Sequence, residues 1–250
     1  MAKVTTYTVV DSLTPTSEAL VRLKDLRGKV AGCDALGILQ IALKDEFWRQ
    51  AAVVSSFGAE SAVLLHLVAQ VDPNTPVLFL NTGKLFGETL RYRDRLQEQL
   101  GLCDVRSIGP NPRLREEFDP EGTLWSRDAD ACCDFRKVQP LRQALSKFGA
   151  QITGRKRFQT GARANMERVE FFEGRFRFNP LADWNQAMLN QYIETRALPV
   201  HPLVDDGYPS IGCVPCTRRV APGGGYRDGR WAGLDKDECG IHLGVDGEGI

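Results

Sequence analysis

Short apolar runs alternate with longer segments of helical periodicity from residue 51 onward. The runs Ala51–Ser55 and Val77–Leu80, with a third near Asp104–Ile108, predict strands. Between them, the segments Ala62–Val71 and Gly87–Leu100 predict helices. Because strands and helices alternate in this order, we expect a parallel sheet with helices on both faces.

Helical periodicity also precedes the first strand, over Ser17–Trp48. The later pattern predicts a helix, a strand, a hairpin and a second helix, at Lys137–Phe148, Gln151–Thr153, Phe171–Asn179 and Asn185–Arg196. Beyond Cys216 the chain turns to Gly, Pro and Arg, and Pro222–Gly225 predicts a flexible hinge. These patterns divide the chain into N-terminal helices packed on the core (1–50), an α/β domain (51–220) and a mobile C-terminal tail (221–250).

Composition and charge narrow the class of protein. Of the 250 residues, 42% are hydrophobic and 26% are charged, which is ordinary for a soluble globular protein. Basic and acidic side chains number 32 each, so the formal net charge is zero and no bulk attraction to nucleic acid or membrane is expected. Met1–Val10 lacks a secretion signal, and no apolar run is long enough to span a bilayer. We therefore expect a cytoplasmic protein with free thiols.

Two close pairs of cysteines, Cys132 with Cys133 and Cys213 with Cys216, supply four soft ligands. Four thiolates can hold either zinc or an iron–sulfur cluster. Adjacent side chains cannot easily reach one small tetrahedral ion, whereas a cubane cluster spreads its binding points over several iron atoms. The pattern therefore favours a cluster over zinc. A disulfide framework is disfavoured because the chain has an odd number of cysteines, seven, and no secretory signal.

A fifth cysteine, Cys239, stands apart from both pairs, beside charged residues and His242. The thiolate is the reactive form of cysteine, and cationic neighbours lower the pKa of a thiol. A four-thiol site with a separate thiol suggests a redox enzyme that uses a nucleophilic cysteine. Cys33 and Cys103 have apolar neighbours, and we expect both to be inert core residues.

A nucleotide site is expected at the carboxyl ends of the strands, where ligands bind in α/β sheets. The turn after the first strand reads SSFGAES, and the following helix begins with N–H groups that could bind an anion. An ordinary strand-to-helix turn would look much the same. Gly83-Lys84 is followed by Leu85, so the chain lacks a Walker A motif, and it also lacks G-x-G-x-x-G. The candidate ligand contacts in this turn are Ser55, Ser56, Gly58 and Ser61.

Basic side chains occupy further loop positions that could face the same ligand. Most Lys and Arg residues are solvated surface groups, but these follow predicted strand ends or cysteines. Arginine also suits bidentate contacts to phosphate or sulfate. The candidates are Arg136, Lys137, Arg155, Lys156, Arg157, Arg227 and Arg230.

Four motifs together resemble the assimilatory phosphoadenylylsulfate/adenylylsulfate reductases, over about Ala51 to His242. SSFGAES is similar to the family's pyrophosphatase-type loop, and GRKRFQTGARA to its arginine loop. LNTGKLFGETL is similar to its second strand and turn, although Asn81 stands where aspartate is usual. KDECGIH resembles its catalytic tail motif, commonly KxECGxH, and is the most specific of the four.

The resemblance implies a parallel sheet flanked by helices, of the adenine nucleotide alpha hydrolase-like fold, with a flexible C-terminal tail. Members with CC and CxxC pairs look like the [4Fe-4S] type that prefers adenylylsulfate, which implies a cluster on Cys132, Cys133, Cys213 and Cys216. The resemblance further implies thioredoxin-dependent reduction of adenylylsulfate to sulfite and AMP, in sulfate assimilation and cysteine biosynthesis. The nucleophile would be Cys239, forming an S-sulfonate. The residues around the phosphosulfate would be Lys137, Arg157, Arg227, Arg230 and His242.

Three alternatives stay open. The first is a reductase of 3′-phosphoadenylylsulfate, or of both substrates. The second is a nucleotide-activating transferase with a pyrophosphatase-type loop, such as a tRNA thiolation enzyme, which the zero net charge weakens. The third is a binding module stabilised by zinc or a cluster, which leaves the ECGIH tail unexplained. The sequence does not decide whether the chain forms a homo-oligomer.

Overall fold

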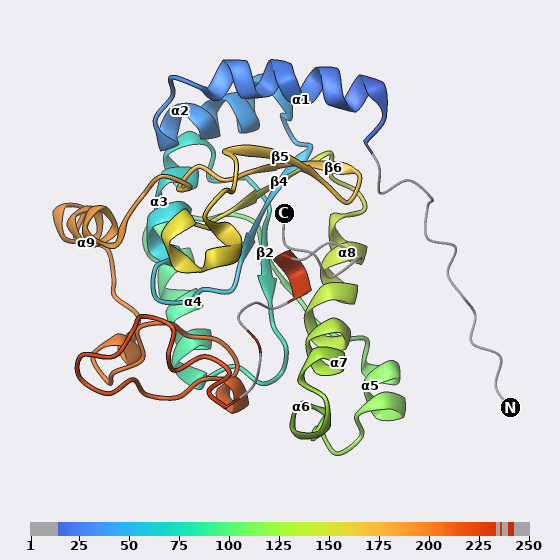
Figure 1. Cartoon of the computed structure of the whole chain (residues 1–250), viewed down its shortest axis with the longest axis vertical. Helices are drawn as coiled ribbons and strands as arrows, with labels where there is room; N and C mark the ends of the chain where they lie inside the picture. Colours follow the sequence, from blue (N-terminus) through green and yellow to red (C-terminus); the bar gives the residue numbers. More distant parts are fainter. Residues whose placement is uncertain (1–14, 234–235, 237–239, 243–250) are drawn as a thin grey trace, which may run out of the picture.

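The computed structural model describes residues 15–233, residue 236 and residues 240–242. Its centre is a six-stranded sheet with the strand order β3-β2-β1-β4-β6-β5 (Figure 1). The strands are β1 (Ala51–Ser55), β2 (Val77–Leu80), β3 (Val105–Ile108), β4 (Ala150–Thr153), β5 (Val169–Phe172) and β6 (Arg175–Phe178).

The sheet is parallel apart from its edge strand β5, which confirms the prediction of a parallel sheet. In the centre, Val53 of β1 pairs with Val77 on one side and with Ile152 on the other. Strands β5 and β6 form the predicted hairpin, whose turn places Glu173 and Gly174 at positive φ, 49° and 76°. The central strands β1 and β2 are buried at every position, as continuous apolar runs in parallel sheets should be.

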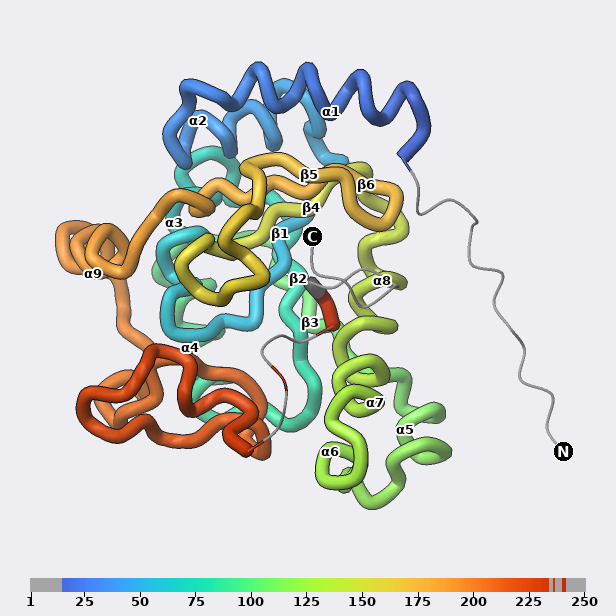
Figure 2. The backbone as a smooth tube through the Cα atoms, in the orientation of Figure 1, coloured from blue at the N-terminus to red at the C-terminus, as the bar shows by residue number. Residues whose placement is uncertain are grey.

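One face of the sheet carries the larger apolar core. Leu26, Ile38, Leu65, Leu96 and Leu189 from five helices join alternate strand residues there. These helices are α1 (Ser17–Val30), α2 (Ala35–Gln40), α3 (Ser61–Val71), α4 (Gly87–Leu100) and α9 (Gln186–Thr195), with the π-helix η1 (Ile41–Glu46) after α2. Figure 2 shows α3, α4 and α9 together on one side of the strands, with α1 and α2 above them. The helical region predicted at Ser17–Trp48 is thus confirmed, with a break between α1 and α2.

The opposite face carries a smaller apolar core, where Leu141 and Leu145 pack on Val54 and Leu80. The helices on this side are α5 (Pro112–Phe118), α6 (Leu124–Arg127), α7 (Ala129–Cys133), the π-helix η2 (Asp134–Val138) and α8 (Gln139–Leu145). The predicted helix Lys137–Phe148 begins earlier than expected, at α7, because the Asp128 carboxylate caps that end by accepting from two backbone N–H groups. No helix in the described part of the chain is both long and apolar enough to cross a membrane.

Short 3-10 turns connect the remaining segments, and the glycine-rich stretch is folded into turns. These are η3 (Arg157–Gln159), η4 (Gly161–Arg163), η5 (Pro202–Val204), η6 (Val214–Cys216) and η7 (Gly240–His242). After η6, a bridge between Thr217 and Arg230 closes a loop that contains the glycines. A Cβ on Gly229 would lie 2.2 Å from the Arg218 carbonyl oxygen, so this closure requires glycine. The mobility of the tail 221–250 stays a prediction.

The two cysteines expected in the core differ in their burial. Cys103 is exposed and its thiol donates to the Gly101 carbonyl, while Cys33 is only partly buried. Cys103 lies two residues before β3, an edge strand with no fully buried residue, so its apolar neighbours do not enclose it. The expectation of a core residue is therefore wrong for Cys103, whereas Cys33 packs against the edge of the larger core.

A charged network is buried beneath the β5–β6 hairpin. The Glu170 carboxylate accepts hydrogen bonds from Arg155 and Asn179, and it lies 3.9 Å from an Arg177 nitrogen. Arg177 is 1% exposed, and its guanidinium stacks over the Phe172 ring at 3.3 Å from the centroid. The Glu170 carboxylate is therefore shared by two buried guanidinium groups.

Replacing Glu170 by glutamine should lower the free energy of unfolding by about 3 kcal/mol, because it removes the buried carboxylate that Arg155 and Arg177 share. Urea denaturation at neutral pH measures this change. Glu88→Gln is the matched control, because Glu88 pairs with Arg91 at the surface, where loss of the pair should cost less than about 0.5 kcal/mol. Equal effects in the two variants would contradict the role assigned to Glu170.

Candidate active site

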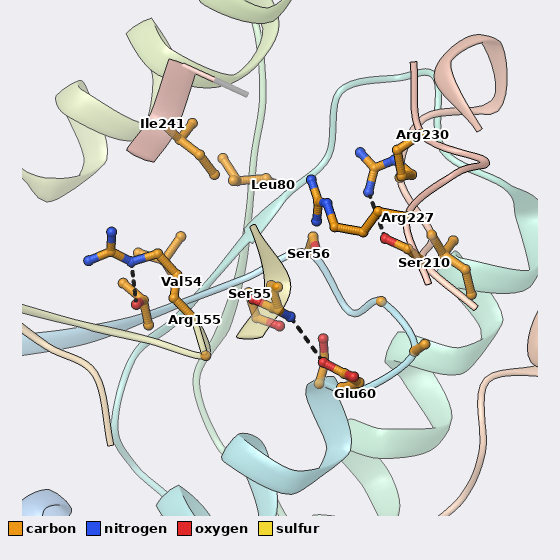
Figure 3. A pocket seen from close by; sticks show the side chains of 18 of the residues that line it. Val54, Ser55, Ser56, Glu60, Leu80, Arg155, Ser210, Arg227, Arg230 and Ile241 are labelled. Carbon is orange, nitrogen blue, oxygen red and sulfur yellow. Dashed lines mark hydrogen bonds between the residues drawn. The ribbon is translucent and has the colours of Figure 1, made fainter. Parts of the chain in front are cut away.

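A cavity of about 190 Å³ lies at the carboxyl ends of β1, β2 and β4. Its walls come from the loop after β1, the loop after β4, the segments around residues 210–213 and 226–231, and the helix η2 (Figure 3). From β1 the chain adds β2 and β3 on one side, and it then returns to add β4 on the other side of β1. The order of the strands therefore reverses between β1 and β4. Such a switch point is where open α/β sheets bind ligands.

The loop after β1 is shaped by a buried phenylalanine. Phe57 adopts a positive φ of 51°, is fully buried and packs edge-on against Phe79. Its N–H donates to the Ser55 hydroxyl, which holds the turn. Because Phe57 turns into the core, Ser56 and Gly58 line the cavity, and α3 begins at Ser61 beside them. The N–H groups at the start of this 11-residue helix can therefore face an anion.

A buried ion pair joins the loop after β1 to the loop after β4. Lys156 donates to the Glu60 carboxylate, which also accepts from the Gln159 amide at 3.1 Å. Burial lowers the pKa of Lys156, and Glu60 offsets part of that effect. Burial and the same carboxylate raise the pKa of Tyr226, from the glycine-rich loop. Glu60 thus ties together three segments that line the cavity.

Two arginines line the cavity from the glycine-rich loop, as Figure 3 shows. The Arg230 guanidinium lies 4.4 Å from the Trp231 ring centroid and donates to the Ser210 hydroxyl at 3.3 Å. Arg227 lies over the same ring at 5.7 Å. A Cβ on Gly212 would lie 2.4 Å from an Arg230 nitrogen, so the close approach of this side chain requires glycine there.

The structure brings most of the predicted substrate contacts to this one cavity. Its lining includes Ser55, Ser56, Gly58, Ser61, Lys137, Arg227 and Arg230. Arg157 does not line it, because its guanidinium turns outward to pair with Asp183 and donates to the Met166 carbonyl. The backbone of His242 belongs to η7, but its side chain lies outside what the structure describes, as does Cys239 altogether.

The lining also includes residues that the sequence did not single out, among them Tyr226, Ser210, Glu60 and Arg163. Tyr226 and Ser210 lie in irregular loops, where no periodicity marks a residue as facing a ligand. Glu60 lies in the SSFGAES motif and Arg163 in the GRKRFQTGARA motif. Membership of these motifs is the sequence feature that could have identified them as cavity residues.

The four paired cysteines meet beside the cavity. Cys132 and Cys133 end α7, Cys213 immediately precedes η6, and Cys216 is its last residue. Burial and the neighbouring Cys133 raise the pKa of Cys132 to about 11, and Cys213 and Cys216 add smaller contributions. Thiols that influence one another in this way lie close together, although 80 residues separate Cys133 from Cys213 in sequence.

Hydrogen bonds fix the second pair relative to the loop after β2. The Thr82 hydroxyl lies 3.2 Å from the Cys213 sulfur, and the Val214 N–H donates to the Lys84 carbonyl at 2.8 Å. Within residues 15–233, 236 and 240–242, no group of three or more His, Cys, Asp or Glu side chains is arranged as the ligands of one metal ion. The chemistry of the donor set, four gathered and largely buried thiols, fits a thiolate-bound cluster.

A second buried ion pair fixes the cysteine-bearing helix. Arg136, three residues after Cys133, donates to the Asp119 carboxylate and, at 2.8 Å, to the Thr82 carbonyl. The other Asp119 oxygen accepts from the Leu124 N–H. Burial alone would raise the pKa of Asp119, but the hydrogen bonds from Arg136 and the backbone outweigh it and lower that pKa. The pair therefore connects helix η2 to the loops after β2 and α5.

The chain is similar in sequence to a known domain family and to several known proteins. Residues 50–219 match the phosphoadenosine phosphosulfate reductase domain. A protein of Mesorhizobium japonicum named adenosine 5'-phosphosulfate reductase is 48% identical over 222 residues, which are 86% of this chain and 87% of the relative. A protein of the same name from Chelativorans sp. is 51% identical over 192 residues, or 77% and 78% of the two chains.

A solved structure shares the fold. The crystal structure of phosphoadenylyl-sulfate reductase from Candida auris, a phosphate complex, has a TM-score of 0.68 and 21% sequence identity. The match covers 83% of this chain and all of the Candida auris chain. The predicted fold, a mostly parallel sheet flanked by helices, is thereby confirmed.

Replacing Asp119 by asparagine should lower the free energy of unfolding by about 3 kcal/mol at pH 7, because it leaves Arg136 buried without its partner. A carboxyl whose pKa is lowered on folding stabilises the protein above the unfolded-state pKa and loses that effect in acid. The difference in the free energy of unfolding between the wild type and the variant should therefore become smaller as the pH falls below about 4. Urea denaturation at pH 7 and pH 3.5 measures it, with Asp104→Asn, which removes a surface pair with Arg106, as the control. A difference that does not change with pH would contradict this account.

Proposed function

The chain belongs to the phosphoadenosine phosphosulfate reductase family, and from that membership we propose that it reduces adenylylsulfate to sulfite and AMP. One observation carries the proposal. A single cavity gathers a helix N-terminus and the basic residues Lys137, Arg227 and Arg230 next to four clustered cysteines. Adenylylsulfate joins a nucleotide to a phosphosulfate, whose adjacent negative charges require such an environment.

We assign the phosphosulfate to the basic side of this cavity. The turn after β1, with Ser55, Ser56, Gly58 and Ser61, offers hydroxyl and N–H donors to the nucleotide. Lys137, Arg227 and Arg230 would neutralise the charge that develops on the departing phosphate. Arg163, which lines the same cavity, is a further candidate, and His242 is proposed from its place in the tail motif alone.

The first chemical step is attack of the Cys239 thiolate on the sulfur of adenylylsulfate. A bond forms between Sγ and that sulfur, and the bond from the sulfur to the bridging phosphate oxygen breaks. The electron pair of the broken bond leaves with AMP. The enzyme then carries an S-sulfonated cysteine, and the basic side chains stabilise the leaving group.

The second step requires an external dithiol, for which we propose thioredoxin. A donor thiolate attacks Sγ of Cys239, and sulfite departs with the electron pair of the bond to the sulfonate. The second donor thiol then resolves the mixed disulfide, so the donor is oxidised to a disulfide and Cys239 returns as a thiol. The next cysteine back along the chain is Cys216, which belongs to the four-cysteine group, so an outside thiol is the natural reductant.

We further propose that Cys132, Cys133, Cys213 and Cys216 hold a [4Fe-4S] cluster. Bound there, the cluster would add fixed charge beside the substrate and join the two cysteine segments. The thiol chemistry of Cys239 is complete without electrons from it. Such an enzyme would act in sulfate assimilation and cysteine biosynthesis, in a reducing cytoplasm.

Replacing Cys239 by serine should abolish sulfite release from adenylylsulfate with thioredoxin, while AMP still binds. In the wild-type protein, substrate without reductant should add the mass of one sulfonate to Cys239, and thioredoxin should remove it. Peptide mass spectrometry and a sulfite assay measure both steps, with Cys103→Ser as the control because Cys103 is exposed and does not line the cavity. Near-normal turnover in Cys239→Ser, or an adduct on Cys33 or Cys103, would overturn the mechanism. Turnover of 3′-phosphoadenylylsulfate in a parallel assay would establish the alternative substrate.

Serine in place of Cys132 or of Cys213 should each lower the iron and acid-labile sulfide content per chain, because each removes a proposed cluster ligand. Elemental analysis and the visible absorption of the purified protein measure the loss. The control is Cys33→Ser, since Cys33 lies against α1 and donates to the Lys29 carbonyl. Full iron in both ligand variants would exclude the assignment, and zinc without sulfide in the wild type would favour the zinc alternative.

A further inference from the structure

The loop after β2 contacts the segments that carry both cysteine pairs. Toward the second pair, the Thr82 hydroxyl lies 3.2 Å from the Cys213 sulfur, and Leu85 forms an antiparallel bridge with Cys213. Toward the first pair, the Thr82 carbonyl accepts a hydrogen bond at 2.8 Å from Arg136, which follows Cys133 by three residues. Thr82 therefore links the two cysteine segments, one through its hydroxyl and the other through its carbonyl.

The Arg136 side chain is buried, and both terminal nitrogens of its guanidinium are fixed. One donates to the Thr82 carbonyl and the other to the carboxylate of Asp119, which is 1% exposed. Asp119 balances the charge of the guanidinium, so the pair can be buried. A planar guanidinium makes two such contacts in one rigid fork, which an ammonium group cannot do. Arg136 does not line the cavity, so these contacts leave it apart from the proposed substrate site.

The third nitrogen of the guanidinium makes no hydrogen bond. Nε of Arg136 is buried, and no partner for it occurs in the part of the chain that the structure describes. Arg136 follows Cys132 by four residues on the helical run α7–η2, so the two side chains leave the helix on the same side. Burial raises the pKa of the Cys132 thiol, and the nearby charge of Arg136 opposes that rise. A buried N–H without an acceptor is costly, and the acceptor that a metal centre on these thiols would bring is sulfur.

We propose that Arg136 is a positioning residue for the four-cysteine group. Its hydrogen bond to Thr82 holds the two cysteine pairs at the separation that one metal centre needs, and its Nε–H donates to a sulfur of the bound centre. Partners that orient the ligands of a metal typically change its affinity about 10- to 100-fold when they are removed. This inference rests on the proposed function, which places a metal centre on the four cysteines.

The first variant is Arg136→Lys, which keeps the positive charge but cannot bond to Thr82 and Asp119 in one fork. A chelator should remove iron from this purified variant about tenfold faster than from the wild type. Glu170→Gln disrupts a buried ion pair of the edge strand β5, and it should lose iron at the wild-type rate although it is also destabilised. Arg106→Lys makes the same substitution in a surface pair and should leave iron loss unchanged.

The second variant, Asp119→Asn with Arg136→Met, removes both charges, so no buried charge is left unpaired if Arg136→Lys folds poorly. This double variant should also lose iron about tenfold faster. It lacks the Nε–H donor as well. The shift of the Fe–S stretching bands on transfer from H₂O to D₂O, measured by resonance Raman spectroscopy, should therefore be smaller than in the wild type.

The readouts separate this inference from the proposed function. A wild type without iron and sulfide contradicts the proposed cluster. The positioning role is then tested on metal-free protein with Co²⁺, whose affinity, followed by thiolate-to-cobalt absorption, should still be about tenfold weaker in Arg136→Lys. Wild-type metal retention in both Arg136 variants would overturn the inference alone. Equally fast iron loss in Glu170→Gln would also overturn it, because general destabilisation would then be the cause. An unchanged D₂O shift in the double variant would overturn the contact assigned to Nε–H.

Discussion

Burial of the central strand β1 on both faces is the constraint on which the rest of the molecule depends. All of its residues are buried, with Val53 in the larger apolar core and Val54 in the smaller one. A strand in that position needs parallel neighbours and helices on both faces. The carboxyl ends of β1, β2 and β4 then lie at the same edge of the sheet. The loops that line the cavity start at these ends, so the packing of the core determines where a ligand can bind.

Charge pairing keeps those loops in place. Glu60, Asp119 and Glu170 are buried acids, and each pairs with a buried base from a different segment of the chain. Removing one partner of such a pair costs more than the pair itself contributes, because the remaining charge stays buried. Arg230 differs from these bases. Within the described chain its contacts are a serine hydroxyl and an aromatic ring, which leave its positive charge unneutralised at the cavity wall.

The sequence predicted the parts of the molecule that local pattern controls. β1 and β2 have the predicted bounds because each is a continuous apolar run between turn residues. The start of α7 was missed because it depends on a cap by Asp128 and not on periodicity. Arg155, Lys156 and Arg157 are consecutive bases, and only the folded loop decides that Arg157 turns outward to Asp183. Contacts such as Lys156 with Glu60 join residues 96 positions apart, which no local pattern encodes.

The surroundings of Trp231 have an optical consequence. This indole is 3% exposed, and the positive groups of Arg227, Arg230 and Lys236 lie 4.4 to 5.9 Å from its ring. Cations at such distances interact with the π electrons of the ring, so its emission energy and quenching depend on where they sit. The chain has four tryptophans, and Trp48 and Trp125 are exposed. A change at the cavity wall therefore alters the fluorescence of one buried indole, and the protein carries its own reporter of ligand entry.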